Sequence, residues 1–142
     1  MTLVVDASVA LKWYVSEDGS DSARQILAGD EALVAPELVV AEVCNASWIA
    51  YRRREIAADQ HSQIAQDITR VFDRLETLVR HASRATVIAR ELDHPVYDCF
   101  YLAVSEAFDA PFVTADGRLL ARVAGTPFAA RTFGLQNYTP RN

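Results

Sequence analysis

Short apolar runs alternate with longer amphipathic segments along this 142-residue chain. The runs that we expect to form strands cover residues 3–6, 32–35, 111–114 and 129–133. This alternation is typical of a parallel sheet covered by helices, because parallel strands need a crossover segment between them. The sequence therefore predicts an α/β fold with three layers (α/β/α), in which helices flank a central, mostly parallel sheet of four to five short strands.

Helical patterns occupy the segments between the expected strands. The expected helices begin near residue 8, run from Ser20 or Ser22 to residue 28, and cover residues 37–54, 56–75, 82–92, 96–108 and 117–123. Residues 75–79 are ambiguous between a helix end and a short strand. We expect residues 1–134 to form one domain, and residues 135–142 to form a loosely held C-terminal tail.

The composition indicates a single domain without a membrane segment. Hydrophobic residues make up 51% of the chain, which is enough for one core at this length. No apolar run approaches the roughly 18 residues of a membrane span. Asp6 and Lys12 interrupt the apolar start of the chain, which does not fit a signal peptide. We therefore expect a cytoplasmic protein that has no membrane partner.

Basic residues do not indicate a uniformly basic surface for nucleic acids, because the net charge is −5. Nearly all of the basic residues are arginine, which codon usage explains well enough. Arg52, Arg53 and Arg54 nevertheless form a cluster that is a weak candidate for phosphate contacts, because guanidinium groups bind phosphate bidentately. Trp13 and Trp48 are able to stack on bases, but we expect both to pack in the core.

Four carboxylates, Asp6, Glu42, Asp98 and Asp116, lie where packing favours an apolar or neutral residue. Asp6 and Asp116 follow expected strands, and Glu42 and Asp98 lie in apolar helical stretches. In open α/β sheets the strand ends line the crevice where ligands bind. Each acid also has a structural explanation: helix capping for Asp6 and Asp116, partial exposure for Glu42, and the helix dipole for Asp98.

Convergence of the four acids would cause strong repulsion, which a hard divalent cation relieves. Mg²⁺ fits best, with Mn²⁺ as a second possibility, because the chain has neither a calcium-type loop nor a His and Cys cluster for zinc. In this hypothesis Asp6, Glu42 and Asp98 hold the main ion, and Asp116 completes its shell or a second site. Such a site suits hydrolysis of a phosphodiester by a metal-activated water.

Other polar residues are assigned supporting roles. Ser8 and Thr114 are expected to orient the acids, with local capping and turn bonding as the alternative. His61, His81 and His94 are isolated in the sequence, and we expect surface or capping roles for them rather than metal binding.

Four pieces of the sequence together resemble the PIN-domain family and, more narrowly, a VapC-type toxin. They are Asp6-Ala7-Ser8 after the first strand, Glu42 with Asn45 on a helix, residues 94–103, and residues 112–116. The resemblance spans nearly the whole chain, in the right order and spacing. Its most specific parts are Tyr-Asp-x-x-Tyr-Leu-Ala and Thr-x-Asp.

The resemblance implies a Mg²⁺-dependent endoribonuclease that is the toxin of a type II toxin–antitoxin system. The residues that it implies are Asp6, Glu42, Asp98 and Asp116 as catalytic, metal-binding acids, with Ser8, Asn45 and Thr114 supporting them. It also implies an RNA substrate, a small VapB-like antitoxin that blocks the cleft, and a homodimer. The apolar side of helices such as the one over residues 60–75 is a candidate dimer surface.

Two alternatives of the same fold remain open: an RNA-processing nuclease without an antitoxin, and a non-catalytic module that binds RNA or protein. Loss of one or more acids marks the non-catalytic kind, and here all four are present. Gly117 and Arg118 stand where some relatives carry a further acid, so a second fully occupied metal site is in question. Lys12 cannot serve as the lysine of a receiver domain, and Ser8 replaces the second Asp of a haloacid-dehalogenase-type phosphatase.

Overall fold

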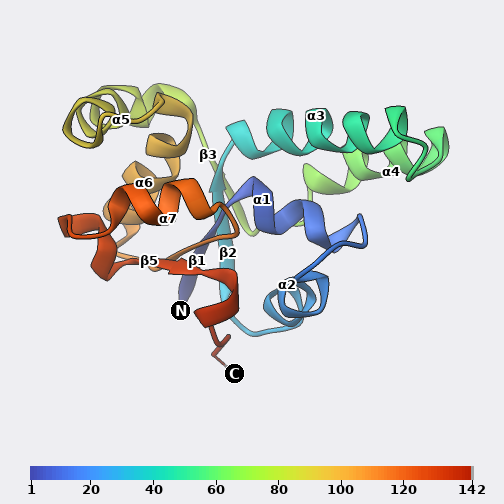
Figure 1. Cartoon of the computed structure of the whole chain (residues 1–142), viewed down its shortest axis with the longest axis horizontal. Helices are drawn as coiled ribbons and strands as arrows, with labels where there is room; N and C mark the ends of the chain where they lie inside the picture. The colour runs from blue at the N-terminus through green and yellow to red at the C-terminus, as the bar shows by residue number, and fades with distance from the viewer. Residues whose placement is uncertain (142) are drawn as a thin grey trace.

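A parallel five-stranded sheet in the order β3-β2-β1-β4-β5 forms the centre of the protein (Figure 1). The computed structural model describes residues 1–141. The strands are β1 (Thr2–Val5), β2 (Ala32–Pro36), β3 (Arg74–Glu76), β4 (Phe112–Thr114) and β5 (Thr132–Gly134). All four strand pairings are parallel. The prediction of a mostly parallel sheet of four to five short strands is confirmed.

Seven α-helices flank this sheet within residues 1–141. They are α1 (Ala7–Ala10), α2 (Ser20–Leu27), α3 (Leu38–Arg52), α4 (Ala58–Ile68), α5 (Leu78–Leu92), α6 (Val96–Phe108) and α7 (Gly117–Val123). Three 3₁₀ helices complete the fold: η1 (Leu11–Trp13), η2 (Pro127–Ala130) and η3 (Leu135–Asn137). Helices α1 to α4 lie on one side of the sheet and α5 to α7 on the other (Figure 1). None of these helices is long and apolar enough to span a membrane.

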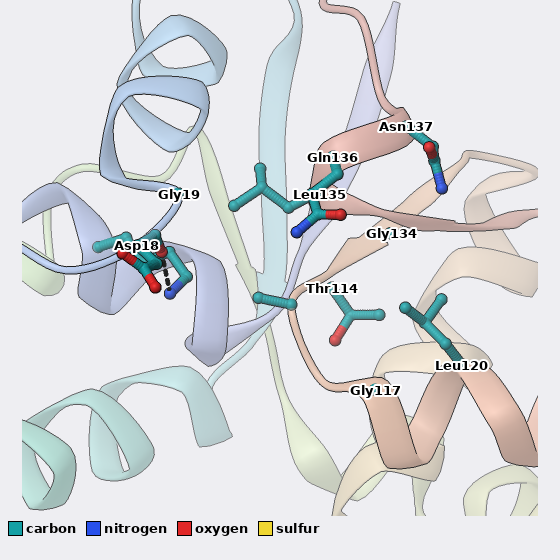
Figure 2. Close-up of a pocket in the computed structure, with 11 residues that line it drawn as sticks. Asp18, Gly19, Thr114, Gly117, Leu120, Gly134, Leu135, Gln136 and Asn137 are labelled. Atoms are coloured by element: carbon teal, nitrogen blue, oxygen red, sulfur yellow. Dashed lines mark hydrogen bonds between the residues drawn. The ribbon is translucent and has the colours of Figure 1, made fainter.

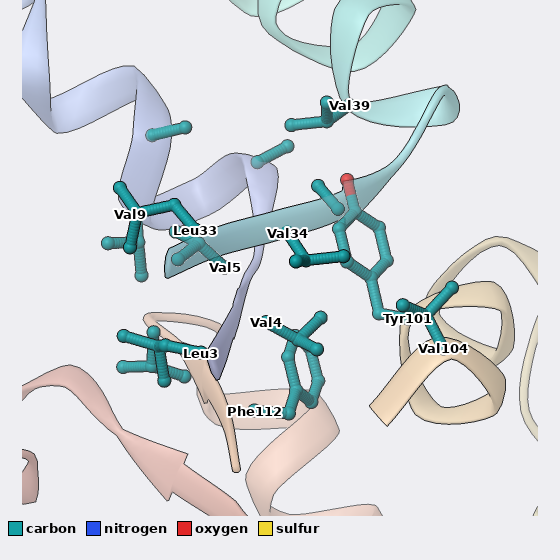
Figure 3. Packing of buried hydrophobic residues seen from close by; sticks show 14 of the residues in the cluster. Leu3, Val4, Val5, Val9, Leu33, Val34, Val39, Tyr101, Val104 and Phe112 are labelled. Atoms are coloured by element: carbon teal, nitrogen blue, oxygen red, sulfur yellow. The ribbon is translucent and has the colours of Figure 1, made fainter. Parts of the chain in front are cut away.

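Strand β1 occupies the middle of the sheet because its residues are apolar on both faces. Leu3, Val4 and Val5 are completely buried, as parallel strands covered on both sides require. Val4 pairs with Val34 of β2 on one side and with Phe112 of β4 on the other. Figure 3 shows these side chains packed together in the core.

The chain changes direction across the sheet between β1 and β4. It passes from β1 to β2 and then to β3 on one side, and from β4 to β5 on the other. Because crossovers between parallel strands are right-handed, the helices after β1 and after β4 cover opposite faces. The adjacent ends of β1 and β4 are therefore a topological switch point, where open α/β sheets bind their ligands. Asp6 and Asp116 follow these two strands.

The segment expected as one long helix over residues 56–75 contains a helix, a turn and a strand. Helix α4 ends at Ile68, and β3 begins at Arg74. Asp73 connects the turn to β2: its carboxylate accepts the Leu33 N–H at 2.7 Å, and its own N–H donates to the Leu33 carbonyl at 2.9 Å. Pairing with β2 therefore overrides the local helical pattern, and the expected helix is wrong beyond Ile68.

Helix α2 begins without the serine cap that the sequence predicts. Its N-cap is Gly19, with a φ of 88°, a conformation that side-chain-bearing residues rarely adopt. Ser20 instead accepts the Glu17 N–H at 3.0 Å and donates to the Val15 carbonyl at 3.2 Å. The hydroxyl thus stabilises the turn that precedes the helix.

The segment expected as a loosely held tail is packed against the domain as far as Tyr138. Leu135 is buried. The Tyr138 hydroxyl donates to Oε1 of Glu31 at 2.5 Å, and its ring contacts Phe133 edge-on with centroids 5.8 Å apart. The expectation of a loose tail is therefore wrong for residues 135–138.

The apolar side of α4, a candidate dimer surface in the sequence, faces the core of the monomer instead. Ile64 and Ile68 are buried there. Large exposed side chains lie on α3, where Trp48 and Tyr51 are each 43% exposed. The prediction of core packing is thus confirmed for Trp13, which is buried, and is wrong for Trp48.

Candidate active site

Asp6 is the most enclosed of the four acids, at 4% exposure. It lies at the carboxyl end of β1, where its Oδ2 accepts hydrogen bonds from Ser8 Oγ at 2.6 Å and from Thr114 Oγ1 at 2.7 Å. Although Asp6 occupies the N-cap position of α1, its side chain makes no capping hydrogen bond. Helix capping therefore does not account for this buried carboxylate.

The same two hydroxyls also hold the turn that follows β4. Ser8 Oγ accepts the Ala115 N–H at 3.0 Å, and Thr114 Oγ1 accepts the Asp116 N–H at 3.0 Å. One hydrogen-bonded group therefore fixes the ends of both strands at the switch point. Ser8 and Thr114 both contact Asp6 directly, and their role in orienting a metal-binding acid stays a prediction.

Asp116 is the N-cap residue of α7. Its Oδ1 accepts the N–H groups of Arg118 at 2.9 Å and Leu119 at 3.4 Å. The capping role that the sequence offered as an alternative is thus present for Asp116. Its second oxygen, Oδ2, takes no part in the cap. The negative charge of the Asp116 side chain also acts on Asp6 and raises the pKa of that carboxyl.

Glu42 reaches the site from helix α3 and is held by helix α6. Its Oε1 accepts a 2.8 Å hydrogen bond from the Tyr101 hydroxyl. Tyr101 is completely buried and stacks on Phe112 of β4. Sequence reasoning did not find this partner, because nothing in the local pattern links residues that are 59 positions apart.

Asp98 lies in the first turn of α6 with His94 beside it. Nε2 of His94 is 2.6 Å from Oδ2 of Asp98, and the two side chains are 11% and 21% exposed. The sequence predicted a surface or capping role for His94 and not this contact. His94 precedes Pro95, the N-cap of α6, so the helical spacing of side chains does not predict that it meets Asp98.

Electrostatic interactions connect the four carboxylates, and Asp6 takes part in most of these interactions. Burial, together with the charges of Asp98 and Asp116, raises the pKa of Asp6 to about 6, although its two hydroxyl hydrogen bonds lower it. Burial, together with the charges of Asp6 and Asp98, raises the pKa of Glu42 to about 7. The structure therefore brings the four acids together, and their negative charges disfavour one another.

The donor chemistry of this site fits a hard divalent cation. Within residues 1–141 no three His, Cys, Asp or Glu side chains are arranged closely enough to hold a metal ion as they stand. Mg²⁺ does not require such a cage, because it keeps several waters and is usually bound by one or two carboxylates. Such an ion stabilises carboxylates like Asp6 and Glu42, whose pKa is raised by burial and by neighbouring negative charge.

Two groups of predicted residues lie apart from this contact network. Asn45 is exposed on α3, about one turn beyond Glu42. Arg52 lies near the far end of the same helix, roughly 15 Å along its axis from Glu42 at 1.5 Å per residue. Its guanidinium carbon lies 5.2 Å from the centroid of the Trp48 ring. The arginine cluster is therefore a separate surface and not a part of the acid site.

The fold and the site together define an open parallel α/β protein with four interacting acids at its switch point. Its sequence matches the model of the PIN domain over residues 3–126, which is most of the chain. The protein belongs to the PIN domain family, and the resemblance seen in the four sequence pieces is confirmed.

Two curated relatives are similar over most of their length. Ribonuclease VapC3 of Pyrobaculum aerophilum is 30% identical over 121 residues, which cover 84% of this chain and 92% of the relative. Ribonuclease VapC1 of Mycobacterium tuberculosis is 30% identical over 124 residues, which cover 83% of this chain and 88% of the relative.

Two solved structures share the fold. The crystal structure of PAE2754 from Pyrobaculum aerophilum has a TM-score of 0.65 and 23% sequence identity, covering 96% of this chain and 90% of that one. A toxin-antitoxin complex from Klebsiella pneumoniae has a TM-score of 0.69 and 13% identity, covering 96% of this chain and 100% of that one. At these identities the likeness establishes the α/β architecture.

Proposed function

We propose that this protein is a metal-dependent endoribonuclease and the toxin of a type II toxin–antitoxin pair. The observation that carries the proposal is Asp6, a buried carboxylate at the switch point that interacts with three further acids. The names of two relatives, both ribonucleases VapC at 30% identity, support RNA as the substrate.

The four acids are proposed to hold Mg²⁺, or Mn²⁺ in its place. Asp6, Glu42 and Asp98 would hold the main ion, directly or through the waters that it keeps, and Asp116 would complete its shell through the oxygen that does not cap α7. A bound divalent cation supplies an activated water and neutralises charge on the phosphate. The support is the donor set, which consists of oxygens only and carries excess negative charge.

The neighbouring side chains position these acids for hydrolysis of a phosphodiester bond. Ser8 and Thr114 restrict Asp6 to one orientation, since both of their hydroxyls donate to the same oxygen. His94, which lies in the segment before α6, restrains Asp98 in the same way. Such outer contacts reduce the reorganisation needed when the substrate and the ion bind.

The proposed partners are a small VapB-like antitoxin, an RNA substrate and a second copy of the chain in the cytoplasm. The antitoxin is suggested by one structural neighbour, which is a toxin-antitoxin complex. The cationic and aromatic side chains of Arg52 and Trp48 at the far end of α3 are a candidate RNA contact, because stacking and guanidinium groups both bind unpaired nucleotides. Arg53 and Arg54 extend that surface.

Cleavage of total RNA by the purified chain tests this proposal. The reaction is compared in Mg²⁺, in Mn²⁺ and in EDTA, with Asp98→Asn beside the unchanged protein. Asp30→Asn is the matched control, because Asp30 is an exposed acid outside the site. We expect cutting that needs the cation, is lost in Asp98→Asn and is kept in Asp30→Asn.

Equal cutting in EDTA, or by Asp98→Asn, would contradict the metal-dependent mechanism. No cutting by folded protein that carries no copurified inhibitor would favour the non-catalytic module. The remaining alternative is an RNA-processing nuclease without an antitoxin. The neighbouring genes distinguish it from a toxin, since such a nuclease has no small cotranscribed inhibitor gene beside it.

A further inference from the structure

A pocket of about 400 Å³ lies next to the acid site. It is enclosed by the loop before α2, the turn after β4, and the corner where β5 meets η3 (Figure 2). Its volume falls within the range of roughly 300–1,000 Å³ that is usual for small-molecule sites. Of the side chains in the acid site, Thr114 alone lines this pocket.

Thr114 is shared by the pocket and the acid site. It lines the pocket, and its Oγ1 donates the 2.7 Å hydrogen bond to Asp6. Ala115 and Gly117 also line the pocket, so that Asp116 lies between two lining residues. A group bound in the pocket would therefore contact the same turn that positions an acid of the proposed site.

Glycines leave three walls of the pocket without side chains. Gly19, Gly117 and Gly134, three of the five glycines in the chain, line it. A Cβ at Gly134 would lie 3.1 Å from Leu120 Cδ1, and one at Gly19 would lie 3.2 Å from Leu135 Cδ2. Larger residues would therefore displace the apolar side chains that form the walls. At Gly117, by contrast, nothing lies within 4 Å of such a Cβ, so a flat group is able to approach the backbone closely there.

The remaining walls combine apolar side chains with side-chain amides. Leu120 and Leu135 are apolar, and the neighbouring Gln136 and Asn137 each offer an amide donor and a carbonyl acceptor. In Figure 2 the amide of Gln136 projects towards Thr114, whereas the side chain of Leu135 points towards Gly19. A nucleobase has matching chemistry, with flat apolar faces and an edge of donors and acceptors.

A cation adds to the affinity for a nucleotide. Lys12, the only lysine of the chain, lines the pocket. Its ammonium donates to Glu17 Oε1 at 3.1 Å and to the Asp18 carbonyl at 2.7 Å, and an ammonium has three donors. The third donor is suited to an oxygen of the RNA backbone.

We propose that this pocket binds one unpaired RNA base next to the scissile phosphate, and that Gln136 and Asn137 determine which base is accepted. The inference rests on the proposed ribonuclease function and adds a specificity site to it. Sequence-specific proteins read RNA mostly in this manner, by contacts to the edges of splayed bases in single strands.

The first test is the base preference of cleavage on an RNA pool with randomised sequence, read by sequencing of the cut ends. Gln136→Ala removes one carboxamide, and Gln63→Ala is the matched control because Gln63 is exposed on α4, away from the pocket. We expect the unchanged protein to prefer one base at a position beside the cut. Gln136→Ala should lower that preference by about tenfold, the scale of one base-edge contact, while Gln63→Ala keeps it. An identical preference in all three proteins would overturn the inference.

The second test measures binding without cutting, in EDTA. The four ribonucleoside 5′-monophosphates are titrated separately at millimolar concentration, and the side-chain amide signals of Gln136 and Asn137 are followed by NMR. Gln136→Ala assigns the Gln136 signal. We expect one nucleotide to shift both signals more than the other three do. The absence of any shift would overturn the inference even if the protein cuts RNA, whereas selective shifts without RNA cutting would contradict only the nuclease proposal.

Discussion

The Tyr101 hydroxyl donates a 2.8 Å hydrogen bond to Oε1 of Glu42 and thereby joins helix α6 to helix α3 at the acid site. Tyr101 is itself fixed by the core, because it is completely buried and its ring stacks on Phe112 with centroids 5.6 Å apart. A carboxylate of the candidate site is thus oriented by a side chain that also belongs to the hydrophobic core.

Replacement of Tyr101 by Phe removes this hydroxyl and little else. The hydrogen bond lowers the pKa of Glu42, which burial raises to about 7, so its loss should raise that pKa further. Ionised Glu42 becomes scarcer at neutral pH, and we expect RNA cleavage to fall by roughly tenfold near pH 7 and to recover at higher pH. The pH–rate profile at limiting Mg²⁺ checks this, and an unshifted profile would contradict it. Stability should fall by about 1 kcal/mol.

His94→Ala removes the side chain that restrains Asp98. The 2.6 Å contact between the two residues holds one oxygen of the carboxylate in place. Loss of such an outer partner typically weakens metal affinity by about 10–100-fold. We expect the Mn²⁺ concentration for half-maximal cleavage to rise accordingly, with His94→Gln partly restoring it through its amide donor. The same Mn²⁺ dependence in all three proteins would show that His94 does not position the acid.

Asp6→Asn should stabilise the protein in the absence of metal. The folded-state pKa of about 6 exceeds the ordinary value of 3.8, so the contribution of Asp6 to stability is most favourable below about pH 4 and is lost as the pH rises through 6. A neutral amide does not carry this penalty, which amounts to at most about 3 kcal/mol at 1.36 kcal/mol per pKa unit. Urea unfolding at pH 8 in EDTA measures the difference. If Asp6→Asn were less stable than the unchanged protein, burial of the ionised Asp6 carboxylate would not destabilise the fold.

Glu76 should make the protein sensitive to acid. Burial opposes its ionisation, but hydrogen bonds from His81 at 2.8 Å and from Arg74 hold the pKa of Glu76 below its ordinary value of 4.5. A lowered pKa contributes stability that is present above about pH 4.5 and is lost as the pH falls through the folded-state value. Glu76→Gln should be less stable by about 2 kcal/mol at neutral pH.

Urea unfolding of both proteins across this pH range provides the check for Glu76. The stability of the unchanged protein should fall more steeply below about pH 4.5 than that of Glu76→Gln. Parallel curves for the two proteins would assign the acid sensitivity to other carboxylates.

Much of the candidate site was predictable from sequence because its acids lie at ends of elements with clear local patterns. Residues 3–5 are apolar on both faces, which indicates a central parallel strand, and Asp6 follows directly. Asp116 follows β4 in the same way. The acids could therefore be named, together with Ser8 and Thr114, although their roles stay predictions.

The partners of the acids and the pocket were not predictable, because they come from segments that are distant in the chain. Tyr101 meets Glu42, and η3 meets the turn after β4, only after the sheet has formed.

Periodicity over a few residues was enough to predict the α/β class, the strands β1, β2 and β4, and the four acids. That residues 74–76 form a strand depends on tertiary contacts, because Asp73 binds the backbone of Leu33 in β2. The tertiary structure also decided which side chains restrain each acid and which walls enclose the pocket. These depend on contacts between distant elements, whose free energy no local pattern contains.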